Sequence, residues 1–206
     1  MVRHDSRSRP ETLERPAKSA ARTFAASEPS APVLSEVGRQ VSRGRTTVVF
    51  TRDLPFERNS VWAMLTKPTS LRLWAPYTSD RDLSQVGRCV LTMLGDGDAP
   101  DVDIPSVVLV ADAPESLEYS WANDMLAWHL LTVGSGSRLI LHQTLADETM
   151  ASAVAAGWHL CLEVASAVLA GSTVAPIRGM DAMKHGWQDL NDRYAVALGV
   201  PPTKIG

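Results

Sequence analysis

The chain has 206 residues, 45% of them hydrophobic, and a formal net charge of −3 at pH 7, which is typical of one globular domain with an extension. No apolar run approaches the roughly 20 residues of a membrane helix, and the N-terminus lacks the apolar segment of a secretory signal, so we expect a cytoplasmic protein without membrane insertion. Because basic residues concentrate in the first 45 positions, the acidic remainder argues against a nucleic-acid surface, which needs clustered Lys and Arg.

The N-terminal part of the chain is predicted to be a tail. Residues 1–44 are rich in Ser, Pro, Ala and Arg and lack apolar periodicity, which is typical of a disordered basic segment. Order is expected to begin at Arg45, because residues 46–51 have the β-branched and aromatic character of a strand. A short amphipathic helix is expected between Pro55 and Pro68, and a second helical turn follows it.

Period-two alternation then predicts a run of strands. The first three are expected at residues 87–94, 106–111 and 117–121. Two more strands, at residues 126–133 and 137–145, form a hairpin around the turn Gly134-Ser135-Gly136. Both hairpin strands are apolar on two faces, so a second subunit is one explanation for what covers the outer face, and a homodimer stays open.

Two helices are predicted to complete the domain. The long one begins near Asp147-Glu148, whose carboxylates suit the positive end of a helix dipole, and ends at Gly171. The last helix is amphipathic and ends at Gly199, after which residues 200–206 are predicted to be a short tail.

The long helix is expected to lie across the sheet, because neither surface can bury itself alone. The stripe that should face the sheet consists mostly of small side chains: Ala153, Gly157, Cys161, Val164 and Val168. Small side chains leave room, so we predict an apolar cavity between sheet and helix. Its lining is completed by Trp74, Leu91, Met93, Tyr119, Trp121, Trp128, Leu139, Leu141 and Gln143. The alternative is that these side chains simply fill the core.

The order of elements is accompanied by local motifs that run through most of the chain. These are Val61-Trp62, Leu65-Thr66, Pro68, Leu71, Trp74, Gly87-Arg88, Pro114, Leu117, Tyr119, Trp121, Trp128, Arg138-Leu139-Ile140-Leu141, Ala156-Gly157-Trp158-His159, Trp187, Leu190, Arg193-Tyr194-Ala195 and Leu198-Gly199. In this order and spacing they resemble the SRPBCC or START-like (helix-grip) superfamily, in the branch of heat-shock-protein ATPase activator homologues. The resemblance extends from about residue 46 to residue 199.

The resemblance implies an α+β helix-grip domain over residues 45–199, in which a curved antiparallel sheet wraps around a long C-terminal helix. It also implies a cavity, since members of the superfamily bind lipids, polyketides, hormones or other apolar molecules, and a minority are aromatases, cyclases or dehydratases. One departure concerns the strand after the hairpin turn, which usually carries a Thr-His pair. Here it reads His142-Gln143, so an amide replaces the inward imidazole.

The remaining chemistry-bearing residues are interpreted as structural. His159 falls on the polar stripe of the long helix, where a pair with Glu163 would be a surface interaction. Cys89 and Cys161 are expected to pack in the core, without a disulfide or zinc site. His129 and His142 are expected on the outer face of the hairpin, close enough to contact each other but too few to bind a metal.

The acidic loop residues also carry no predicted site. The set Asp96, Asp98, Asp101 and Asp103 lacks the spacing of a calcium loop, and we predict no cofactor and no metal. The function favoured by the sequence is non-catalytic binding of a small apolar molecule. Two alternatives stay open: an enzyme of the cyclase, aromatase or dehydratase kind, with Tyr119 as its acid or base, and a co-chaperone or stress-response adaptor with a chaperone partner.

Overall fold

A computed structural model describes residues 33–97 and 99–204, so the part of the predicted tail over residues 1–32 lies outside the described residues. The described part contains these elements: β1 (Glu36–Ser42), β2 (Arg45–Leu54), α1 (Arg58–Thr66), α2 (Pro68–Trp74), β3 (Tyr77–Ser79), β4 (Gly87–Met93), β5 (Val102–Asp112), β6 (Ser116–Trp121), β7 (Asp124–Val133), β8 (Gly136–Thr144), the 3₁₀ helix η1 (Glu148–Met150), α3 (Ala151–Leu169), the 3₁₀ helix η2 (Gly179–His185) and α4 (Trp187–Leu198).

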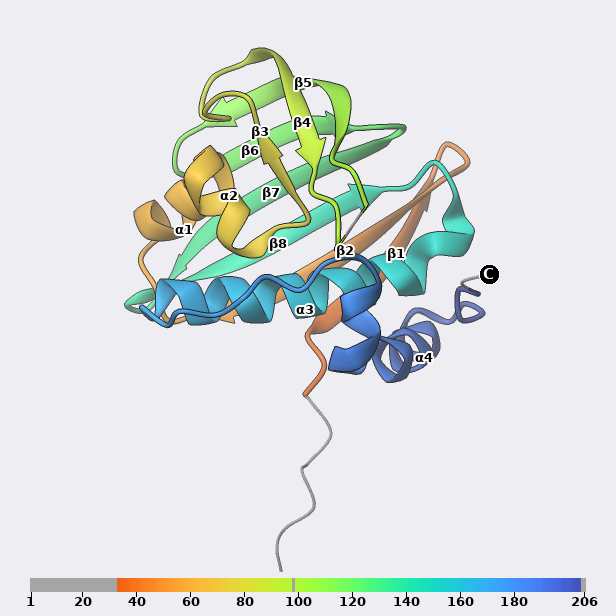
Figure 1. The fold of residues 1–206 in the computed structure, drawn as a ribbon. Helices are drawn as coiled ribbons and strands as arrows, with labels where there is room; N and C mark the ends of the chain where they lie inside the picture. Colours follow the sequence, from red (N-terminus) through yellow and green to blue (C-terminus); the bar gives the residue numbers. More distant parts are fainter. Residues whose placement is uncertain (1–32, 98, 205–206) are drawn as a thin grey trace, which may run out of the picture. The chain divides into compact units, whose positions relative to one another are not determined.

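The strands form one antiparallel sheet in the order β1-β2-β8-β7-β6-β5-β4-β3. The sheet curls around the long helix α3, while α1 and α2 cover one end of its concave side (Figure 1). Helix α4 packs against α3 and β1. The predicted α+β helix-grip fold is therefore confirmed, with the core between the concave sheet face and α3.

The helical segment begins at the predicted acidic residues, but its first turn is the 3₁₀ helix η1, and α3 follows from Ala151. The Asp147 carboxylate accepts a hydrogen bond of 3.0 Å from the Thr149 N–H, which satisfies one of the free donors at a helix start. The segment Glu148–Leu169 is long and apolar enough to cross a membrane by length and composition, but 61% of its most apolar window is buried within the fold. Such burial is what a core helix shows.

The prediction that order begins at Arg45 is wrong. Strand β1 pairs with β2 along its whole length, from Glu36 opposite Thr51 to Ser42 opposite Arg45. The two strands are joined by Arg43 and Gly44, which both have positive φ, the geometry of a tight hairpin turn. Nearly every residue of β1 is exposed, so the strand has no apolar alternation, and composition alone did not reveal it.

The prediction of a free C-terminal tail from residue 200 is also wrong. Thr203 is buried, and its hydroxyl donates to the Thr149 carbonyl at 2.7 Å. The Thr203 N–H donates to the Ser152 hydroxyl at 3.0 Å, and the Thr203 carbonyl accepts from the Asn191 amide at 3.1 Å. Thr203 thus connects the start of α3 to the middle of α4.

Candidate functional site

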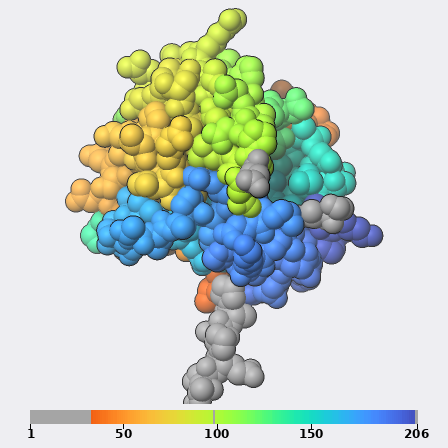
Figure 2. All heavy atoms as spheres, viewed as in Figure 1, coloured from red at the N-terminus to blue at the C-terminus, as the bar shows by residue number. Residues whose placement is uncertain are grey.

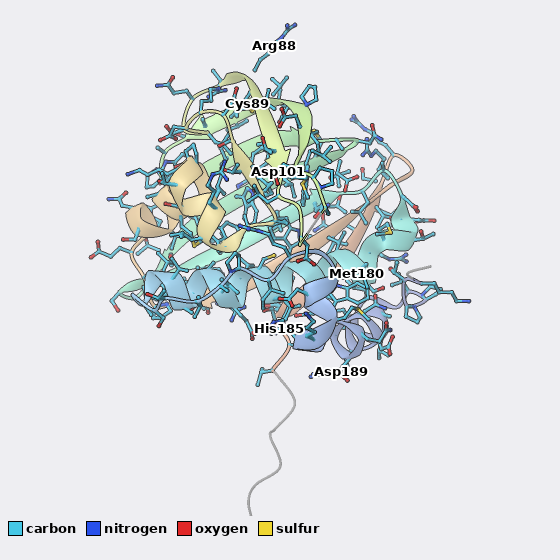
Figure 3. The ribbon with its side chains drawn as sticks, in the orientation of Figure 1. Arg88, Cys89, Asp101, Met180, His185 and Asp189 are labelled. Carbon is cyan, nitrogen blue, oxygen red and sulfur yellow. The ribbon has the colours of Figure 1, made fainter. Side chains whose placement is uncertain are left out.

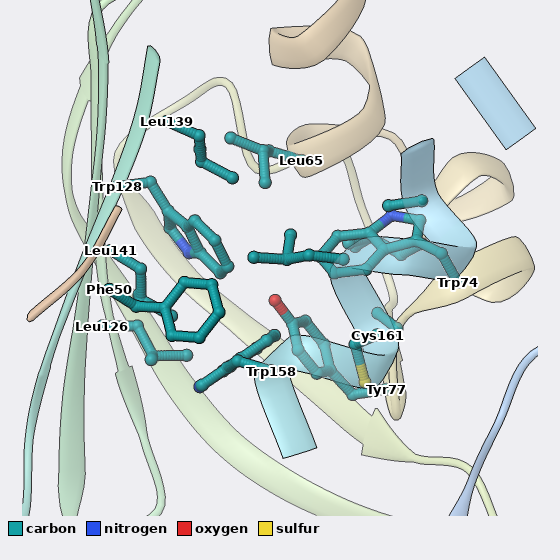
Figure 4. Close-up of a cluster of buried hydrophobic side chains, with 14 of the residues drawn as sticks. Phe50, Leu65, Trp74, Tyr77, Leu126, Trp128, Leu139, Leu141, Trp158 and Cys161 are labelled. Carbon is teal, nitrogen blue, oxygen red and sulfur yellow. The ribbon is translucent and has the colours of Figure 1, made fainter. Parts of the chain in front are cut away.

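The space between sheet and α3 is filled by aromatic side chains in its deep part. Trp74, Tyr77, Tyr119 and Trp128 are almost completely buried, and Figure 4 shows indoles from α2, α3 and the sheet converging between these elements. Most of the predicted lining lies in this packed interior: Trp74, Leu91, Tyr119, Trp128, Leu139, Leu141 and Val164 are buried in the core, and Val168 packs against it. The deep part of the predicted cavity is therefore occupied by the protein itself.

Trp158 of α3 packs against three other tryptophans and fills the space between the helix and the sheet. Its ring lies 5.1 Å from Trp128, 5.6 Å from Trp121 and 6.3 Å from Trp74, measured between ring centroids. Two of these contacts are edge-on, the arrangement that aromatic quadrupoles favour. Trp158 belongs to one of the family motifs, but it is absent from the lining predicted from the sequence.

Gln143 holds Trp158 in place. Its side-chain carbonyl accepts the Trp158 indole N–H at 2.7 Å, and its amide donates to the Asp124 carboxylate at 2.7 Å. The second Asp124 oxygen accepts the Ala146 N–H at 2.7 Å. The amide that replaces the family's usual imidazole therefore has both ends engaged by protein, and a ligand is not needed to satisfy it.

A smaller pocket remains at the open side of this cluster. Its volume is about 200 Å³, and its wall consists of Pro76, Trp121, Gln143, Val154, Gly157, Trp158, Leu160, Cys161, Ile177, Arg178, Gly179, Ala182 and Trp187. Four predicted lining residues, Trp121, Gln143, Gly157 and Cys161, are in this set. Met93 stands behind the wall, where its sulfur accepts the Trp121 indole N–H at 3.2 Å.

Gly157 is the point where α3 leaves room. An added Cβ at this position would have no atom within 4 Å, although the residue is in the middle of a 19-residue helix. The neighbouring Cys161 thiol is buried, and burial raises its pKa to about 12, so it contributes an apolar wall and not a thiolate.

The outer wall of the pocket comes from the segment after α3. Residues around η2 lie against the loop between β4 and β5 (Figure 2), where the Asp181 N–H donates to the Asp96 carboxylate at 3.2 Å. Gly179 has φ +50 and approaches Asp96 so closely that a Cβ would lie 2.8 Å from the Asp96 Cβ. The predicted lining includes no residue of this segment, so it lacks Ile177 and Arg178, and Trp187 at the start of α4 was identified only as part of a motif.

Arg178 is the charged residue of the wall. Its Nε donates to the Ala75 carbonyl at 3.2 Å, and its Nη2 donates to the Arg72 carbonyl at 2.5 Å. Both acceptors lie at the end of α2, so the guanidinium ties the η2 segment to α2 across the pocket. The side chain is half-buried, and burial lowers the pKa of Arg178.

Tyr119, the acid or base of the enzyme alternative, does not reach the pocket. Its hydroxyl is hydrogen-bonded to the Tyr77 hydroxyl and accepts the Trp128 indole N–H at 2.9 Å. Burial raises the pKa of Tyr119 well above its usual value. The proposed acid or base is thus enclosed within the aromatic core.

The interpretation of His159 as a surface residue is wrong. It is 1% exposed, because α4 covers the polar stripe of α3. Its Nδ1 lies 2.7 Å from the Tyr194 hydroxyl, which in turn accepts the Ser35 N–H. Its Nε2 lies 3.1 Å from the Glu163 carboxylate, and burial lowers the pKa of His159 despite that carboxylate. The pair with Glu163 exists, but its imidazole is internal.

The two hairpin histidines lie as predicted on the outer face. The rings of His129 and His142 are 5.4 Å apart and perpendicular, although the register is diagonal, because His142 is opposite Ala127. Burial, and then the neighbouring His129, lower the pKa of His142. Within residues 33–97 and 99–204, no group of three His, Cys, Asp or Glu side chains is arranged to hold a metal ion.

Comparison with known proteins identifies related folds. The model of a protein family described as "Activator of Hsp90 ATPase homolog 1-like protein" matches residues 55–199. No match is found among curated proteins.

Several solved structures are similar in fold. The solution structure of CalU16 from Micromonospora echinospora has a TM-score of 0.60 and 16% identity, and the match covers 82% of this chain and 97% of that one. A protein from Bordetella parapertussis has a TM-score of 0.56 and 22% identity, with 71% and 85% covered. The AHSA1 protein from Silicibacter pomeroyi has a TM-score of 0.52 and 19% identity, with 60% and 97% covered.

Proposed function

Because the chain belongs to the Activator of Hsp90 ATPase homolog 1-like family, we propose that it uses the helix-grip fold of that family to bind a small apolar ligand in the pocket beside Gly157. The proposed site is the residual space between α3, β6 and the η2 segment. The ligand contacts the pocket-facing side of the Trp158 cluster and does not enter the packed interior.

The observation that carries this proposal is the glycine in the middle of α3. A glycine inside a helix is less favourable than alanine by about 0.8–1.0 kcal/mol, and here an alanine methyl group would meet no atom within 4 Å. The chain thus retains a less stable residue at a position where alanine would fit. Such a local conflict between stability and sequence is typical of a functional site.

The size of the pocket limits the ligand. Pockets for drug-sized molecules measure about 300–1,000 Å³, whereas this one has a volume of about 200 Å³. A void of about 150 Å³ lined by apolar side chains accommodates one benzene ring. The pocket therefore suits a single aromatic ring or a short aliphatic chain, and any larger part of a ligand must extend past η2 into solvent.

Titration calorimetry with toluene tests the proposal. The wild-type protein is expected to bind toluene with a saturable heat, and Gly157→Leu is expected to abolish it, because the leucine side chain enters the pocket. Ala170→Leu is the matched control, since residue 170 is exposed at the far end of the same helix. A folded wild-type protein that gives no saturable heat would refute the proposal, as would binding that survives Gly157→Leu.

The adaptor alternative is separated from ligand binding by the same variant. An adaptor acts through its surface, so a chaperone partner captured equally by wild-type protein and Gly157→Leu would favour the adaptor. Capture that is lost in Gly157→Leu would connect the partner to the pocket.

A further inference from the structure

The pocket contains one charge that the protein does not neutralise. Arg178 is the charged residue of its wall, and none of the ion pairs among the described residues includes it. Two of its nitrogens donate to main-chain carbonyls, and Nη1 makes no hydrogen bond within the described part of the chain. A half-buried guanidinium whose Nη1 is open to solvent and makes no hydrogen bond to the described part of the protein can donate to a ligand, because hydrogen bonds between Arg and a carboxylate are among the stronger ones in proteins.

The surroundings of Arg178 do not remove this charge. Its pKa is lowered first by burial, and the guanidinium of Arg72 acts in the same direction. Cys161, and then Asp101 at the end of the β4–β5 loop, act in the opposite direction and raise the pKa. Asp96 is already used by the Asp181 N–H. Among the described residues, Asp101 is thus the one carboxylate found to favour the charged form of Arg178, and it forms no ion pair with it.

Two further polar side chains of the wall are already engaged by the protein. Gln143 has both ends engaged by Trp158 and Asp124, and the Trp121 indole N–H is directed at the Met93 sulfur. Arg178 is the one charged side chain in the wall, so recognition of an anionic part of a ligand falls to it, while the rest of the wall is mostly aromatic and aliphatic surface.

We propose that the ligand is a small monocarboxylic acid with a single aromatic ring or a short branched chain, whose carboxylate pairs with the Arg178 guanidinium at the mouth. This inference rests on the proposed function, which it makes more specific. The apolar body lies against Trp158 and Gly157, and the carboxylate points toward η2. One guanidinium matches one carboxylate in charge and in planar geometry.

Titration calorimetry with two probes of the same shape tests the inference. Phenylacetate and phenylacetamide differ in charge and not in size, so the ratio of their affinities isolates the contribution of the anion. We expect the wild-type protein to favour phenylacetate by about tenfold or more, as a charge-assisted hydrogen bond predicts. Raising the salt concentration should reduce this ratio only slightly, because the pair is partly buried.

Variants of Arg178 test whether this side chain recognises the carboxylate of the ligand. Arg178→Gln is expected to reduce the ratio to about one, and Arg178→Lys to leave an intermediate ratio, since it keeps the charge and loses the planar fork. Arg88→Gln is the control, because this side chain points away from the domain into solvent (Figure 3), and its ratio should equal that of the wild type. Circular dichroism confirms that each variant is folded.

The outcomes separate the two proposals. If toluene binds and both probes bind equally to the wild type, the carboxylate inference is wrong and the apolar pocket stands. If the preference for phenylacetate persists in folded Arg178→Gln, a group other than Arg178 binds the carboxylate, and the inference is wrong. If none of the three probes binds, both proposals are wrong.

Discussion

Replacing Gly157 with alanine should stabilise the protein and weaken ligand binding at the same time. The helix interior gains about 0.8–1.0 kcal/mol from the change, and no steric term opposes it, because the added Cβ meets no atom within 4 Å. For a domain of this size, 1 kcal/mol shifts the melting temperature by about 2–4 °C. Thermal unfolding followed by circular dichroism should therefore show an increase of that size.

Side chains of increasing size at position 157 should weaken ligand binding step by step. Each added heavy atom takes roughly the 30 Å³ share of one water, so alanine removes a small part of the 200 Å³ pocket, and leucine, with four added atoms, removes about 120 Å³ of it. Toluene affinity should fall modestly in Gly157→Ala and disappear in Gly157→Leu. A lower melting temperature for Gly157→Ala would refute the reasoning, because it would mean that the position is not open.

Three further perturbations test the contacts around the site. Burial lowers the pKa of His159, so as the pH falls the imidazole is protonated in the unfolded chain before it is protonated in the folded protein. The free energy of unfolding, measured with urea, should therefore decline as the pH falls below about 6.5. The decline should be shallower in His159→Gln, and an equal decline in that variant would contradict the burial of a neutral imidazole. Gln143→Leu leaves the Trp158 indole N–H without its acceptor and should lower the free energy of unfolding by about 2 kcal/mol or more, whereas a loss under about 0.5 kcal/mol, typical of surface changes, would show that the bond is not formed. Thr203→Val should lower it by about 1–3 kcal/mol, and the exposed Thr173→Val, as the matched control, by less than about 0.5 kcal/mol.

The fold was predictable because its signals are local and repeated. Alternation in β6 and the hairpin, the acidic residues before α3, Gly171 after it and the glycine after α4 each indicate one element, and together they resemble one family. Strand β1 gave no such signal, since its faces are both exposed. Its order comes from pairing with β2, a long-range term that composition does not contain.

The site was only partly predictable for a related reason. The small stripe of α3 correctly indicated room at Gly157, but periodicity could not show that Trp158, one residue further, turns into the sheet and fills the deep space. Arg178 lies in a segment without regular periodicity, and its position follows from two main-chain carbonyls at the end of α2. The face of α3 that carries His159 is polar, and the sequence therefore predicted that it is exposed to solvent. In the structure α4 covers this face, since the burial of a helix face depends on the packing partner as well as on the helix itself.

The tryptophan cluster gives this molecule an optical property of its own. Of the chain's six indoles, Trp121, Trp158 and Trp187 form part of the pocket wall, and Trp158 lies within 6.3 Å of Trp74, Trp121 and Trp128. At such spacing the excited rings exchange energy, so ultraviolet light absorbed in the interior is emitted in part from the rim. The intrinsic fluorescence of the unlabelled chain is therefore expected to change when a ligand enters the proposed site, because the emission comes from the group of rings and not from any single one.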